Sequence, residues 1–154
     1  MSNPVNVVAL VKSLPFRPRG RACVVLTHRY EGQREWAAEL ARQAGADHLD
    51  LLTLFAQDAL LAADIGQLSV SGLFDFLKER SAAPLLVVSG IEFLKATWSG
   101  QASASEHFAS MVETWDRNPC LCFVLQYDST LTARPFRRFR QYQFVVDQKE
   151  TLAL

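Results

Sequence analysis

The sequence predicts a three-layer α/β/α fold built around a five-stranded, mainly parallel sheet. Several short runs are apolar throughout and rich in β-branched residues, as expected of strands that helices cover on both faces. Segments with helical spacing separate these runs, and that alternation is the pattern that builds a parallel sheet. The fold class therefore follows from the order and character of the apolar runs.

The chain of 154 residues suits a single domain, because one core commonly forms at roughly 100–200 residues. We expect residues 1–21 to form an N-terminal helix and a linker, since Pro15 and Pro18 lack the amide donors that a continuing helix needs. Residues 22–154 are expected to form the core.

The composition is that of a globular protein without a strong overall field. Hydrophobic residues make up 49% of the chain and charged residues 21%, which argues against a disordered chain. Sixteen basic and sixteen acidic residues leave a formal charge of zero, so nothing draws the whole molecule to nucleic acid or to an anionic membrane. No apolar run approaches the roughly 20 residues that span a bilayer, and no leader sequence is recognisable. We expect a cytoplasmic protein that does not bind membranes.

The first half of the chain is predicted to form a strand, a helix and a second strand. Residues 23–27, CVVLT, are continuously apolar and suit a central parallel strand. A helix is expected over residues 35–46, where apolar residues recur every four positions before a glycine ends the segment. The run HLDLLTLF at residues 48–55 is predicted to be the second strand.

The second half continues the alternation. Apolar positions on one face predict a helix over residues 70–80. Helical spacing returns around residues 108–115, behind a small, polar stretch at residues 98–106 that is expected to form a loop. The remaining strands are expected at residues 84–90, 120–127 and 142–147.

The cysteines and histidines predict no metal site and no cofactor. Cys23, Cys120 and Cys122 lie in apolar runs without the paired spacing of a zinc site, so we expect buried, reduced thiols. Cys120 and Cys122 are two apart on one strand and should face the same layer of helices. The three histidines are scattered and lack companions in a metal-binding motif.

The turn after the first strand has the length of a Walker A motif, GxxxxGK[ST], without its chemistry. That motif uses glycines to wrap backbone amides around phosphates, a lysine for the β and γ phosphates and a hydroxyl for magnesium. Gly32 keeps the second glycine, but Thr27 replaces the first, Gln33 replaces the lysine and Arg34 replaces the hydroxyl. We therefore predict a P-loop NTPase-like domain with a RecA/AAA-type core. Its degenerate phosphate loop comprises Thr27, His28, Arg29, Gly32, Gln33 and Arg34.

The Walker B motif is degenerate as well. A Walker B strand ends in an acidic residue that helps to hold magnesium, whereas the run PLLVVSG ends at Ser89 and Gly90. Glu92 lies two residues further along and reaches the metal only if the loop bends unusually. The joint loss of lysine, hydroxyl and acid removes the main electrostatic stabilisation of phosphoryl transfer. We expect a protein that is not an enzyme.

The order of elements, the chain length and the segments VVSGIEFLK and RRFRQY resemble the small P-loop proteins of BREX-type bacterial phage-defence systems, of the BrxF kind. In that family an apolar strand runs into an Asp-Asn-Ile-Glu-like stretch, and here Ile91 and Glu92 match its last two positions. Family members usually carry an intact Walker A motif, whereas this chain keeps only Gly32. The resemblance implies a role in bacterial defence, beside larger proteins that modify DNA or use ATP. With the degenerate motifs, it leads us to expect a non-catalytic assembly or adaptor subunit.

Two other functions are kept as alternatives. One is an ATPase with a rearranged site, in which Arg34 or Arg29 replaces the lysine and Glu92 serves magnesium. The other is a nucleic-acid-binding module in residues 134–142, because guanidinium groups pair with phosphates and aromatic rings stack on unpaired bases. A solvated basic turn is the structural alternative for that segment. Its arginines are Arg134, Arg137, Arg138 and Arg140.

Protein partners are expected, and DNA is weighed as a further partner. Trp98 is the candidate for an exposed partner surface, because it begins the polar stretch WSGQASASE and because tryptophan is enriched at the centres of protein interfaces. The oligomeric state is left open by the sequence.

Overall fold

The five strands form one all-parallel sheet in the computed structural model of the chain, in the order β2-β3-β4-β1-β5. The structure describes residues 5–29, 31–63, 68–98, 103–128, 131–132, 136 and 142–151. The strands are β1 (Ala22–Thr27), β2 (Asp47–Asp50), β3 (Leu85–Ser89), β4 (Cys120–Gln126) and β5 (Val145–Asp147). The parallel α/β architecture predicted from the alternation is confirmed.

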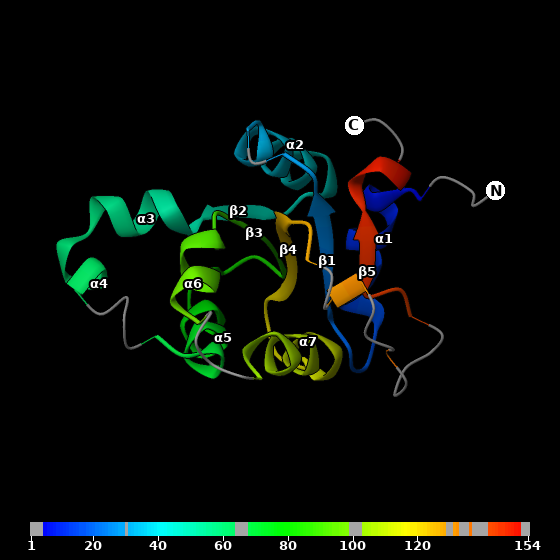
Figure 1. Cartoon of the computed structure of the whole chain (residues 1–154). Coiled ribbons are helices and arrows are strands. Elements are labelled where there is room, and N and C mark those ends of the chain that lie inside the picture. Colours follow the sequence, from blue (N-terminus) through cyan, green and yellow to red (C-terminus); the bar gives the residue numbers. More distant parts are fainter. Residues whose placement is uncertain are drawn as a thin grey trace.

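Helices lie on both faces of the sheet (Figure 1). They are α1 (Val7–Ser13), α2 (Gln33–Ala44), α3 (Leu51–Gln57), α4 (Ala59–Ala63), α5 (Val70–Lys78), α6 (Glu92–Thr97) and α7 (Ala104–Thr114), with 3-10 turns η1 (Leu14–Phe16) and η3 (Gln148–Glu150). Among the described residues, no helix is long and apolar enough to cross a lipid bilayer.

The alternating side chains of the central strands build two separate apolar layers. On β1, Val24 and Leu26 pack with α5, α6 and α7, whereas Cys23 and Val25 pack with α1 and α2. Every residue of β1 is buried, because each strand residue points alternately into one of the two helix layers. The sheet is therefore covered on both faces, as a run without alternation of polar residues predicts.

The three cysteines lie together in the layer formed with α1 and α2. All of them are buried free thiols, and Cys23 and Cys122 are register partners on neighbouring strands. Burial raises the pKa of the Cys120 thiol above its usual value. The expectation of buried thiols that face one helix layer is confirmed.

The predicted second strand is too long. The strand β2 ends at Asp50, and α3 begins at Leu51. The Asp50 side chain accepts a hydrogen bond from the backbone N–H of Thr53, and this N-cap starts a helix inside the apolar run that was predicted to be a strand. The expected loop at residues 98–106 is also too long, because α7 begins at Ala104.

The aromatic cluster beneath the sheet gives a stability prediction. The Phe74 side chain is fully buried, and its ring centroid lies 5.7, 5.4 and 5.3 Å from those of Phe108, Trp115 and Phe123. We expect Phe74→Ala to lower the free energy of unfolding by about 3–5 kcal/mol, measured by urea denaturation. Leu60→Ala, at a side chain that is 82% exposed, is the control and should change it by less than about 0.5 kcal/mol. Equal effects would contradict the assignment of the core.

Candidate functional site

The carboxyl ends of the parallel strands gather the predicted motif residues at one edge of the sheet. The strand β1 ends at Thr27, and α2 begins at Gln33 after a turn. Gly32 precedes the helix with φ of 79°, a left-handed conformation that glycine adopts without steric cost. The strand, glycine turn and helix expected from the sequence are therefore present, and β3 delivers Ser89 to the same edge.

The Gln33 side chain occupies the centre of this edge. It is 3% exposed, and its Nε2 donates to Glu92 Oε1 at 2.6 Å and to Thr27 Oγ1 at 3.3 Å. Its Oε1 accepts from the backbone N–H of Gly90 at 3.3 Å. Both amide hydrogens and the carbonyl oxygen are thus engaged, so the residue at the position of the motif lysine holds β1 to the end of β3.

The two oxygens of the Glu92 carboxylate differ in their hydrogen bonding. Its Oε1 accepts from Gln33 and from the backbone N–H of Gln126 at 3.2 Å. Its Oε2 is a buried atom without a hydrogen-bond partner among the described residues. A carboxylate therefore does point into this edge, although Ser89 and Gly90 stand where the Walker B acid would be. The backbone turn at Gly90 brings it there.

Gly90 has a steric role in addition to its position. Its φ is 71°, and a Cβ atom there would lie 2.8 and 2.9 Å from the two carboxylate oxygens of Asp50. A side chain at this position would therefore displace the Asp50 carboxylate, which caps α3. The glycine after β3 lets the ends of β2 and β3 approach closely.

Ser89 belongs to a hydrogen-bonded chain that the sequence does not reveal. Its Oγ donates to Asp50 Oδ2 at 2.8 Å and lies 2.9 Å from His48 Nε2. Because the single hydroxyl hydrogen goes to Asp50, His48 must donate through Nε2. His48 therefore does not stand as a base toward Ser89, and Ser89 is fully buried. This arrangement is unlike that of an activated serine nucleophile.

Burial sets the protonation of His48. It lowers the pKa of the imidazole below 6.5, the nearby Arg34 guanidinium lowers it further, and the Asp50 carboxylate partly opposes both. The neutral imidazole with its hydrogen on Nε2 is therefore the form that fits the hydrogen bonds from His48 to Ser89 and from Ser89 to Asp50. His48 and Asp50 lie two apart on β2, so an alternation of polar residues on one strand face is the sequence signal that could have found them.

Arg34, one of the two candidates to replace the lysine, contacts residues of α2 and α3. Arg34 Nη1 donates to Thr53 Oγ1 at 3.2 Å, and its Nη2 lies 3.9 Å from Glu35 Oε1. Its side chain is 58% exposed and points toward α3. Arg29 is exposed in the turn. Neither guanidinium has a hydrogen bond to the Gln33 and Glu92 side chains.

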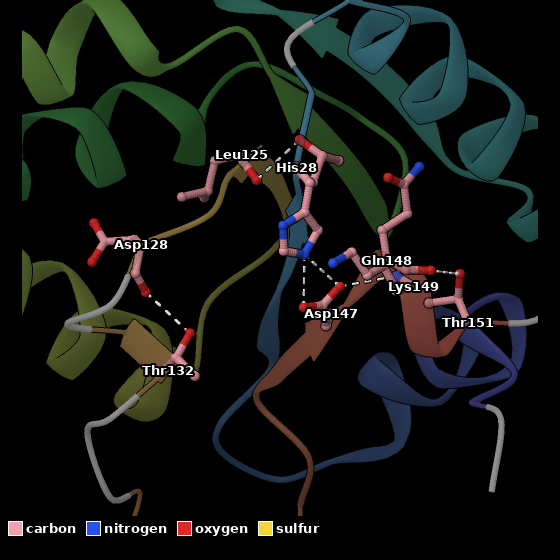
Figure 2. Close-up of polar contacts among 9 residues, drawn as sticks. His28, Leu125, Asp128, Thr132, Asp147, Gln148, Lys149 and Thr151 are labelled. Carbon is pink, nitrogen blue, oxygen red and sulfur yellow. Dashed lines mark hydrogen bonds and ion pairs between the residues drawn. The ribbon is translucent and has the colours of Figure 1, made fainter. Parts of the chain in front are cut away.

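His28 forms a second polar pair at the same edge (Figure 2). Its Nε2 lies 2.9 and 2.8 Å from the two oxygens of Asp147, at the end of β5. Its ring stacks on Tyr127, with centroids 5.4 Å apart. Partial burial works against ionisation of Asp147, but hydrogen bonds from the Lys149 backbone N–H and from His28 outweigh it and lower the pKa of that carboxyl. The pair links the ends of β1 and β5.

Trp98 is buried, so the expectation of an exposed partner surface at this residue is wrong. The side chain is 4% exposed, and Nε1 donates to the Leu68 carbonyl oxygen at 2.8 Å. That bond satisfies the indole N–H and lets the ring join the core between α6 and α7. The polar residues that follow Trp98 in the sequence gave no indication that its side chain is buried.

Arg134, Arg137, Arg138 and Arg140 lie outside the described residues, so the nucleic-acid hypothesis for them stays a prediction. Within the part of the chain that the structure describes, no group of three or more His, Cys, Asp or Glu side chains could hold a metal ion.

No protein-family model matches the sequence, and no curated protein matches it. The residues and contacts of the chain itself therefore carry the functional interpretation.

Replacing the Gln33 amide by a carboxylate tests the central contact. In Gln33→Glu two carboxylates would face each other at the present 2.6 Å contact, and we expect a loss of about 2–3 kcal/mol at pH 7 in urea denaturation. One of the pair would have a raised pKa in the folded state, so the loss should shrink as pH falls from about 7 to 5. Gln57→Glu, at an exposed site on α3, is the matched control. A loss independent of pH would argue against the contact.

The lowered pKa of His48 predicts how stability changes with pH. Because the folded pKa lies below the unfolded value near 6.5, the unfolded chain binds more protons between the two values. Stability is complete above 6.5 and declines as pH falls from there toward the folded pKa. His48→Gln keeps an N–H donor without titrating, so its stability should vary less between about pH 7 and 5 in thermal unfolding. His107→Gln, at an exposed site on α7, should behave like wild type; identical curves for all three would refute this role.

Proposed function

We propose that this chain is a non-catalytic, P-loop-like assembly or adaptor subunit that acts by binding protein partners. The contact between Gln33 and Glu92 carries the proposal. A neutral amide fills the position of the phosphate-binding lysine, and its three hydrogen-bonding groups are already used inside the protein. Turning Gln33 toward a ligand would leave the Glu92 carboxylate with one partner fewer in a buried place, which is costly.

The topology supports the P-loop part of the proposal. The glycine turn follows β1, an inner strand between β4 and β5, and β4 separates β1 from β3. This order is that of RecA/AAA-type cores, in which the strands that carry the two nucleotide motifs have another strand between them. Here β1 and β3 end in the degenerate forms of both motifs, Thr27 to Arg34 and Ser89 to Glu92.

Electrostatics supports the absence of catalysis. ATP brings several negative charges, and a P-loop offsets them with a lysine and a magnesium ion. At this edge the corresponding side chains are a neutral glutamine and a carboxylate, and the carboxylate repels phosphate. The nearest arginine, Arg34, is directed to Thr53 on α3. An ATPase with a rearranged site would need that guanidinium to leave its present partners.

The resemblance to small P-loop proteins of BREX-type systems extends the proposal to bacterial phage defence. It rests on Ile91 and Glu92 in VVSGIEFLK and on the segment RRFRQY. In that setting the protein partners would be larger subunits that modify DNA or use ATP. DNA binding through residues 134–142 stays a prediction from sequence.

Isothermal titration calorimetry with ATP and magnesium tests the proposal. We expect no binding tighter than about 1 mM for the wild-type chain, because Gln33 is neutral and its hydrogen-bonding groups are already engaged within the protein. Arg34→Ala should behave in the same way, and Arg42→Ala, at an exposed site near the end of α2, is its matched control. Submillimolar binding that Arg34→Ala abolishes and Arg42→Ala preserves would overturn the proposal in favour of a rearranged ATPase.

A further inference from the structure

Charge is divided unevenly along this electrically neutral chain. Residues 1–30 contain five basic residues and no acidic one: Lys12, Arg17, Arg19, Arg21 and Arg29. Residues 31–58 contain six acidic residues and two basic ones, the acidic ones being Glu31, Glu35, Glu39, Asp47, Asp50 and Asp58. A chain divided in this way can attract another copy of itself when the two regions lie on different sides of the fold.

The basic region carries an exposed aromatic side chain. Phe16 in η1 is 87% exposed, the highest value among the large hydrophobic residues of the described chain that are exposed. Arg19 follows three residues later and is also exposed. Solvent contact of a whole phenyl ring is unfavourable, since a buried phenylalanine removes roughly 150–250 Å² from water. We call Phe16 and Arg19 the knob.

The acidic region contains an open hollow with an apolar floor. Residues of α2, β2 and α3 enclose about 420 Å³, with Ala38, Leu49 and Leu54 as the apolar side chains. Glu35 stands at its rim with a side chain that is 71% exposed and lies no closer than 3.9 Å to Arg34. The hollow therefore offers an apolar surface for a ring. The mostly exposed Glu35 carboxylate, whose contact with Arg34 is long at 3.9 Å, is the group at its rim that attracts a guanidinium.

The knob lies on the side of the edge strand β5, and the hollow lies on the side of the other edge strand, β2. Next to the knob, Arg17 lies over the Tyr142 ring at 4.3 Å and donates to the Gln143 carbonyl oxygen at 3.4 Å, in the segment that leads into β5. The hollow borders β2, the other edge strand. Figure 1 shows β2 and β5 at opposite ends of the row of strands, four strand spacings of about 4.8 Å apart. Phe16 is 87% exposed, so it does not fill the hollow of its own copy.

We propose that the chain associates head to tail, with Phe16 of one copy seated in the α2–α3 hollow of the next and Arg19 paired with Glu35. The apolar ring, the apolar floor and the opposite charges complement each other. A contact between two different surfaces leads to closed rings or open chains. This names a second copy of the chain as one partner in the assembly role proposed above, and it rests on that role.

Sedimentation or light scattering across a concentration series tests the association. The wild-type chain should exceed its monomer mass of 17.2 kDa as concentration rises, and should return toward it as salt increases from about 0.05 to 0.5 M. Phe16→Ala and Ala38→Trp, which remove the knob and fill the hollow, should each stay monomeric. Leu60→Ala, at another exposed apolar residue, is the matched control and should associate like wild type.

Mixing the variants tests the direction of the contact. Phe16→Ala keeps its hollow and Ala38→Trp keeps its knob, so the mixture should form a 1:1 dimer that neither forms alone. Glu35→Arg should also prevent association, and combining it with Arg19→Glu should restore it, which guards against a folding defect in Ala38→Trp. Thermal unfolding verifies that each variant is folded.

Three results would overturn the inference: a wild-type chain that stays monomeric throughout, a Phe16→Ala variant that associates normally, or a mixture that stays monomeric. A monomeric chain that also fails to bind ATP would remove self-association alone and leave the assembly role to other proteins. A chain that associates and also binds ATP at submillimolar concentration would instead overturn the non-catalytic role.

Discussion

The buried side-chain amide of Gln33 is the contact on which the carboxyl end of the sheet depends. It joins the end of β1 to the turn after β3, and through Glu92 it reaches the backbone of Gln126 at the end of β4. Three parallel strands thus share one hydrogen-bonded centre. A lysine at this position would carry charge and three donors without an acceptor, so it could not accept from Gly90 as the glutamine does. With glutamine at this position, the edge is an internal connection between three strands.

Most of the other carboxylates at this end of the sheet are also held by neutral or weakly basic groups. Asp128, just after β4, is the exception, since Lys95 Nζ lies 3.1 Å from its Oδ2. Asp50 accepts from a serine and a threonine, Glu92 from a glutamine, and Asp147 contacts a histidine. These carboxylates lie at or just after the ends of β2, β3 and β5. Parallel sheets usually bind ligands at this edge, near the N-termini of helices. Here the acidic side chains leave little positive potential for a phosphate, and they are engaged in contacts within the protein.

Much of the fold could be predicted because the inner strands are apolar on both faces, and such runs have few alternatives. The prediction fails where an apolar run changes structure: HLDLLTLF covers the end of β2 and the start of α3, with the capping residue Asp50 at the boundary. The turn before Gln33 was located from its length and glycine. The hydrogen bonds of His48 and Asp50 with Ser89 could not be predicted, because they join two neighbouring strands, β2 and β3. Spacing along one segment does not reveal which strands are neighbours. The burial of Trp98 could not be predicted, because the acceptor of its indole N–H, the Leu68 carbonyl oxygen, is 30 residues away in the sequence.

The buried guanidinium of Arg17 has a consequence for how the sheet is protected. The strand β5 pairs with β1 over three residues, whereas β1 is six residues long and buried throughout. Arg17 donates hydrogen bonds to the carbonyl oxygens of Gly20 and Gln143, and its guanidinium lies over the rings of Tyr142 and Phe144. The Arg17 guanidinium thus helps to hold β5, a short edge strand whose backbone pairing with β1 is weak because it covers three residues. Were β5 to peel away, β1 would present a long, unpaired apolar edge, which is a template for aggregation by strand addition. The cation is therefore a safeguard of solubility as well as a structural contact.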